Sequence, residues 1–131
     1  MKILLVNYEY PPLGGGGGVG THEVALELSK RHCVHVLTSG AKELPRKEEF
    51  PDRDLTVYRA PVLLRTKKAV ASMSSMLSFY PRGIRLGKQL ISACRYDVIN
   101  TWFAIPSGPT GVGLARKFDI PHVLTIIGGD I

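Results

Sequence analysis

Five consecutive glycines, Gly14 to Gly18, stand between the apolar residues 2–6 and a helical pattern that starts at Thr21. Glycine costs roughly 0.5 to 1 kcal/mol of backbone entropy relative to alanine, so a run of this length indicates a need for bare backbone. A glycine turn that enters a helix presents unpaired N–H groups and the positive end of the helix dipole. Because these features suit a phosphate group, we predict an anion site at this turn.

Two common nucleotide motifs do not fit the glycine run. The dinucleotide fingerprint needs its first glycine directly after the first strand and an acid about 20 residues further on. Here residues 7–13 intervene, and the second apolar strand ends in Thr38-Ser39-Gly40 without a carboxylate. A P-loop needs a lysine next to its final Ser or Thr, whereas this chain reads Gly20-Thr21-His22. NAD binding and ATP hydrolysis are therefore disfavoured, and a flexible linker stays as the alternative to an anion-binding turn.

Apolar segments rich in β-branched residues alternate with helical patterns along the chain, which is typical of βαβ units. We predict an α/β fold, a doubly wound, Rossmann-like parallel sheet of about five or more strands with helices on both faces. The predicted strands cover residues 3–7, 34–38, 55–58, 98–101 and 122–126. The predicted helices cover residues 21–31, 69–79, 81–94 and 106–118, and residues 41–54 are expected to form an exposed loop.

Length and composition favour one soluble domain. The chain has 131 residues, 44% of them hydrophobic, and contains no apolar run of the ~20 residues that span a bilayer. Met1-Lys2 enters a strand directly without a signal-peptide pattern, so we expect a cytoplasmic protein. Cys33 and Cys94 are isolated and have no metal-ligand spacing, which predicts buried reduced thiols and no metal site.

The net charge of +6 is unevenly placed. Residues 55–96 contain eight basic side chains and no acid, which points to an anionic partner for this region. We expect no nucleic acid, because aromatic interleaving and nucleic-acid-binding motifs are missing. Arg82, Arg85 and Lys88 lie on one side of the predicted helix 81–94. This side is either a solvated face or a peripheral contact with an anionic membrane at its inner surface.

Several short segments follow one another in a recognisable order along nearly the whole chain. They are residues 1–7, Pro11-Pro12 followed by Gly17-Gly18, residues 23–30, His35-Val36-Leu37-Thr38, Tyr96-Asp97-Val98-Ile99, Ile105-Pro106-Ser107-Gly108, residues 121–125 and Gly128-Gly129-Asp130. In this order and spacing the chain resembles the N-terminal, acceptor-side domain of retaining glycosyltransferases of the GT-B type, family 4 (group 1). The family often has a histidine where this chain has Ile127.

The resemblance implies half of a nucleotide-sugar-dependent hexosyltransferase that uses no metal or other cofactor. Gly16, Gly17 and Gly18 would approach the donor's diphosphate, while a second, donor-binding domain holds most of the nucleotide sugar. Residues 1–131 would then be a single Rossmann-like domain, a fragment that lacks this C-terminal domain and is inactive alone.

The acceptor would be a sugar, a lipid-linked molecule or another hydroxyl compound. Four residues at the predicted ligand edge are candidate acceptor contacts, namely Glu9, Trp102, Ser107 and Asp130. The sequence identifies no catalytic residue. The alternative function is a non-catalytic Rossmann-like module that binds a phosphate, a nucleotide or a partner without reacting.

Overall fold

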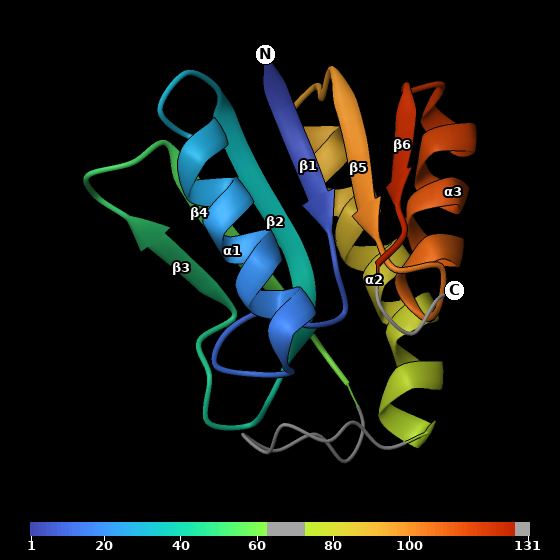
Figure 1. The fold of residues 1–131 in the computed structure, drawn as a ribbon. Coiled ribbons are helices and arrows are strands. Elements are labelled where there is room, and N and C mark those ends of the chain that lie inside the picture. Colours follow the sequence, from blue (N-terminus) through green and yellow to red (C-terminus); the bar gives the residue numbers. More distant parts are fainter. Residues whose placement is uncertain (63–72, 128–131) are drawn as a thin grey trace.

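The strands form one sheet in which β3 is an antiparallel edge (Figure 1). The computed structural model describes residues 1–62 and 73–127. Within them the six-stranded sheet has the order β3-β4-β2-β1-β5-β6, and its other neighbouring pairs are parallel. The strand bounds are β1 Lys2–Val6, β2 Cys33–Gly40, β3 Lys47–Phe50, β4 Leu55–Pro61, β5 Val98–Trp102 and β6 His122–Thr125. The predicted α/β fold class is confirmed.

Helices cover both faces of the sheet. Helix α1 (Gly16–Leu28) lies on one face, whereas α2 (Met73–Ala93) and α3 (Ser107–Phe118) lie on the other (Figure 1). Successive strand residues point to opposite faces of the sheet, so a continuous apolar strand contributes side chains to the hydrophobic cores on both faces. In β1, Ile3 and Leu5 join the cluster under α1, and Leu4 and Val6 join the cluster under α2 and α3.

The glycine run is helical over its second half. Helix α1 begins at Gly16, so the prediction that the helix starts at Thr21 is wrong. Gly18 explains this early start, because a Cβ atom there would lie 3.2 Å from the backbone of Glu9 and Tyr10 and 3.3 Å from the carbonyl oxygen of Leu13. Close packing against the preceding loop thus overrides the low helix propensity of glycine.

A short strand lies inside the segment 41–54, which the sequence predicts to be a loop. Strand β3 pairs antiparallel with β4, with Lys47 opposite Tyr58 and Phe50 opposite Leu55. Its charged residues suggest a loop, but an edge strand with one exposed side accepts them. The prediction of an irregular exposed loop is therefore wrong for residues 47–50.

Helix α2 is one continuous helix where the sequence predicts two. Pro81 lies inside it, although an interior proline removes a backbone hydrogen bond and costs about 3 kcal/mol or more. Phe79 and Leu90 on either side of Pro81 are buried in the core under α2 and α3, and this packing offsets the loss. Residues 69–72 of the first predicted helix lie outside the described residues.

No helix in the described parts of the chain is long and apolar enough to cross a membrane. Cys33 and Cys94 are free thiols, as expected, but both are half-buried rather than fully buried.

Candidate functional site

The glycine turn and the start of α3 lie at the carboxyl edge of the parallel strands (Figure 1). Strand β1 runs between β2 and β5, with Val6 opposite both Leu37 and Thr101. The loops that follow these three strands therefore leave the sheet side by side. This is the edge where open α/β sheets bind ligands.

Two backbone N–H groups at the start of α1 are available to a ligand. The N–H groups of Gly18 and Val19 both donate to the carbonyl oxygen of Gly15, at 3.0 and 3.2 Å. Among the described residues, Gly16 and Gly17 have no acceptor for theirs. The first N–H groups of a helix point along its axis, so this pair suits an anion.

Glu9 stands next to these donors. Its carboxylate oxygen Oε2 accepts a hydrogen bond from the N–H group of Gly15 at 3.3 Å. Gly14 allows this approach, since it has a φ of +85° and a Cβ atom there would lie 2.6 Å from the Cβ of Glu9. The acceptor candidate Glu9 thus lies beside the proposed phosphate position, where its negative charge repels a bound phosphate.

Asn7, at the end of β1, anchors the glycine turn. Its side chain is fully buried, and its amide donates to the hydroxyl of Thr21 at 2.7 Å and to the carbonyl oxygen of Gly17 at 3.4 Å. Its amide oxygen accepts from the N–H group of Glu9 at 3.0 Å. This role of Asn7 was not predicted from the sequence, although a polar residue that ends an apolar strand is a recognisable signal.

Phe103 covers one side of the turn. Its φ of +72° is rare for a non-glycine residue, and its ring fills the space that a Cβ atom on Gly17 would occupy. Gly16, by contrast, has nothing within 4 Å of a Cβ position. The three predicted phosphate-binding glycines therefore differ. Gly16 has free space at its Cβ position and an unbonded N–H group, and Gly17 has an unbonded N–H group but no free space. Gly18 is closely packed, and its N–H group is already hydrogen-bonded.

Two of the four acceptor candidates are buried. Trp102 is 9% exposed, and its indole N–H donates to the side-chain oxygen of Asn100 at 2.9 Å. Ser107 is fully buried, and its hydroxyl accepts from the N–H group of Tyr8 at 2.7 Å. Ser107 thus joins the loop after β1 to the start of α3, whereas the hydrogen bond of Trp102 stays within β5, and both side chains are buried. Asp130 lies outside the described residues.

Arg59 is a second anchor that the sequence analysis counts only as a surface charge. It is 2% exposed and donates to the carbonyl oxygens of Pro11, at 2.6 Å, and of Ser39, at 3.2 Å. Burial lowers the pKa of its guanidinium group, and the nearest acid is Glu48 at 4.0 Å. The signal is its place in the alternation with the buried Leu55 and Val57, which directs Arg59 to the interior.

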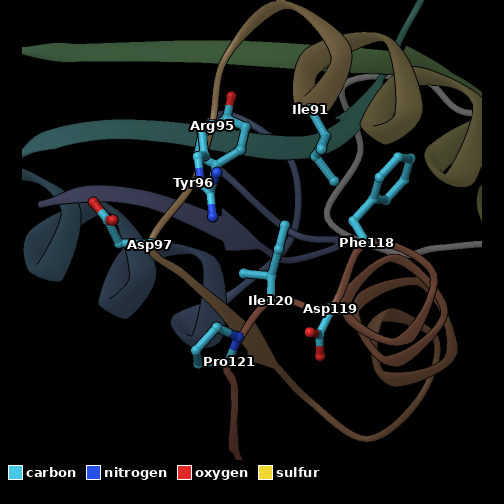
Figure 2. Close-up of a pocket in the computed structure, with 8 residues that line it drawn as sticks. All are labelled: Ile91, Arg95, Tyr96, Asp97, Phe118, Asp119, Ile120 and Pro121. Atoms are coloured by element: carbon cyan, nitrogen blue, oxygen red, sulfur yellow. The ribbon is translucent and has the colours of Figure 1, made fainter.

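A hollow of about 370 Å³ lies at the opposite, amino edge of the sheet (Figure 2). Figure 2 shows Ile91, Phe118 and Ile120 around it, with Asp97 and Asp119 on opposite sides. The hollow and the glycine turn thus lie at opposite ends of the strands, so the hollow is not part of the candidate site. Within residues 1–62 and 73–127, no group of three His, Cys, Asp or Glu side chains could hold a metal ion. The expectation of a metal-free site remains a prediction.

Several known proteins are similar to this chain in sequence or fold. An uncharacterized glycosyltransferase of Methanocaldococcus jannaschii is 29% identical over 131 residues, which are 99% of this chain and 33% of that protein. Sucrose-phosphate synthase from Thermosynechococcus elongatus superposes with a TM-score of 0.76 at 17% identity over 97% of this chain and 33% of its own. A trehalose-6-phosphate protein of E. coli bound with UDP-2-fluoro glucose has a TM-score of 0.52 at 12% identity over 96% and 32%.

The chain spans about a third of the length of these relatives. The two structural likenesses, at low identity, show a shared GT-B domain fold. The family model of Glycosyltransferase Family 4 matches residues 14–129. Because that match covers most of the chain, the protein belongs to glycosyltransferase family 4.

Proposed function

We propose that this chain is the N-terminal, acceptor-side domain of a retaining glycosyltransferase that transfers a hexose from a nucleotide sugar to a hydroxyl acceptor. The observation that carries the proposal is the pair of open N–H groups of Gly16 and Gly17 at the carboxyl edge of the sheet, in a family 4 chain. The E. coli structural neighbour is bound with UDP-2-fluoro glucose, which supports a nucleotide-sugar donor.

The chemistry follows from the charge of the leaving group. A nucleoside diphosphate gains negative charge as the glycosidic bond breaks, and preorganised N–H donors stabilise that charge. Gly16 and Gly17 would supply two such donors with the positive end of α1 behind them. Gly18 would act by letting α1 pack closely on the loop 9–13. These residues require no metal ion for this role.

Acceptor binding is assigned by position. Glu9 lies beside the open donors and is half-buried, so its carboxylate can accept a hydrogen bond from an acceptor hydroxyl. Trp102 and Ser107 would keep the edge in shape rather than touch the acceptor. We retain Asp130 as a contact on the resemblance alone.

The donor's base and sugar would bind mainly to a second domain. The family relatives are about three times as long as this chain, which leaves room for one. The 131-residue chain alone would then bind nucleotide sugars weakly and transfer nothing. Calorimetry of this chain with UDP- and GDP-sugars tests that point, and micromolar affinity would contradict it.

We also propose that the enzyme contacts an anionic membrane peripherally through α2. Leu77 and Tyr80 are 69% and 48% exposed, and Arg85 and Lys88 are exposed further along the same helix. Apolar and basic side chains together favour the surface of an anionic bilayer. Co-sedimentation of the intact protein with phosphatidylglycerol vesicles is the expected result. Equal recovery in the supernatant with and without that lipid would contradict it.

The activity itself is tested with the intact protein and a panel of UDP-, GDP- and ADP-sugars. We expect one of them to release its nucleoside diphosphate in the presence of an acceptor. NMR of the product should show that the anomeric configuration of the donor is kept. Tight binding of a nucleotide sugar without turnover would instead support a non-catalytic module.

A further inference from the structure

A basic groove lies between the β3–β4 pair and α2. Its volume is about 670 Å³, which is within the usual range for small-molecule sites. Tyr58 and Leu86 supply apolar surface. Its polar lining comes from three elements or their flanks, namely Arg46, Lys47, Arg59, Arg82, Arg85 and Gln89.

Four of the cationic side chains are available to a ligand. The fifth, Arg59, uses its guanidinium group on the carbonyl oxygens of Ser39 and Pro11. No acidic residue lines the groove among the described residues. Glu49 forms a salt bridge with Lys47 at 3.2 Å, and both side chains stay more than half exposed. Such an exposed pair neutralises little.

Part of this lining is held in place. Arg82 donates from Nη1 to the carbonyl oxygen of Pro61 at 2.9 Å, which fixes its guanidinium group at the end of β4. Arg85 follows one helical turn later and has no acceptor or acid within the described structure. Lys47 lies 5.8 Å from the ring centroid of Tyr58. The groove thus contains one arginine, Arg85, without a partner in the described structure, beside Lys47 and Arg82, whose contacts leave donor groups unused.

We propose that this groove binds a phosphorylated ligand that carries at least two negative charges. Planar guanidinium groups such as those of Arg82 and Arg85 pair with two phosphate oxygens at once. Tyr58 and Leu86 can contact an apolar face of the same ligand. No residue of the glycine turn lines this groove, and the proposal does not depend on the proposed transferase activity. The phosphate can belong to a soluble molecule or to a lipid headgroup.

Titration of the intact protein with inorganic pyrophosphate tests the proposal. We expect the variant Arg82→Gln/Arg85→Gln to bind at least tenfold more weakly than wild type. The variant Arg31→Gln/Arg116→Gln removes the same charge from exposed positions outside the groove and should bind within twofold of wild type. Arg82 also donates to the carbonyl oxygen of Pro61, so its replacement removes that hydrogen bond as well as a charge. The variant Lys47→Gln/Arg85→Gln removes two groove charges, leaves that hydrogen bond intact and should also weaken binding. Thermal melts confirm that each variant is folded.

Two further experiments identify the source of the phosphate and distinguish the groove from the glycine turn. Vesicles of phosphatidylcholine with and without phosphatidylglycerol replace pyrophosphate, and groove-dependent binding to the anionic vesicles alone would identify a lipid headgroup. Gly16→Val should leave pyrophosphate binding at the groove unchanged, whatever its effect on glycosyl transfer. The proposal is overturned if neither probe binds, or if the groove variants bind both probes as wild type does.

Discussion

The ring of Phe103 lies against Gly17 in the place of a side chain, so the loops after β5 and β1 fit together through one bare backbone position. Phe103 holds this place with a φ of +72°, a conformation that costs of order 1–3 kcal/mol. The glycine run therefore has a packing role in addition to the anion-binding role that we propose.

Gly17→Ala should destabilise the protein by about 1–3 kcal/mol, because the new methyl group overlaps the Phe103 ring. The double variant Gly17→Ala/Phe103→Ala should recover part of that loss in urea unfolding. Gly16→Ala is the matched control, where an open Cβ position and better helix propensity predict a gain of about 0.5–1 kcal/mol. Equal effects at positions 16 and 17 would contradict the packing role of Phe103.

Thr21→Val should cost about 1–3 kcal/mol of unfolding free energy. The change removes the oxygen that accepts from the Asn7 amide and leaves a buried donor without this partner. Thr21→Ser keeps the hydroxyl and should lose clearly less. If both variants unfold at the same urea concentration, the hydrogen bond is not what anchors the turn.

Stability should fall as the pH drops below about 6.5, in part because of His35. Burial lowers the pKa of this ring below 6.5, and its Nδ1 lies 2.6 Å from the hydroxyl of Tyr96. Between the lowered and the ordinary pKa the unfolded chain binds more protons than the folded chain, so the unfolding free energy rises with pH. His35→Gln should flatten this slope by up to about 1.4 kcal/mol per pH unit. Parallel pH profiles for variant and wild type would contradict this account.

Glu9→Gln separates acceptor binding from donor binding. If the carboxylate holds an acceptor hydroxyl, the KM for acceptor should rise about tenfold, since a charge-assisted hydrogen bond contributes about 1.5–3 kcal/mol. The KM for donor should stay or fall, because a negative charge beside the diphosphate is removed. Steady-state kinetics with each substrate varied in turn measures both. A rise in donor KM alone would remove Glu9 from the acceptor site.

The sequence predicts the regular part of the fold well. The β-branched runs at β1, β2, β4 and β5 determine where the core strands lie, and their period places the helices between them. Strand β3 is not predicted because its Lys-Glu-Glu sequence has no strand pattern of its own and forms a strand by pairing with β4. Helix α2 is continuous through Pro81 because tertiary packing of its neighbours outweighs the local cost.

The candidate site is only partly predictable for the same reason. Bare backbone at Gly16 and Gly17 follows from residue type alone. The contribution of Gly18 to packing, the ring of Phe103 beside Gly17 and the buried state of Ser107 each depend on a partner far along the chain. Residue type and spacing carry no signal for such contacts.

The role of the glycine turn is tested most directly by the turnover of Gly16→Val in the intact protein. Its side chain would stand in open space in front of the free N–H groups, so stability should stay near that of wild type. If these donors meet the diphosphate, kcat should fall ~10²- to 10³-fold, as for the loss of one such donor. The donor is the nucleotide sugar that the panel identifies, and a thermal melt of the same sample serves as control. A kcat within a factor of a few of wild type would show that the turn only connects β1 to α1.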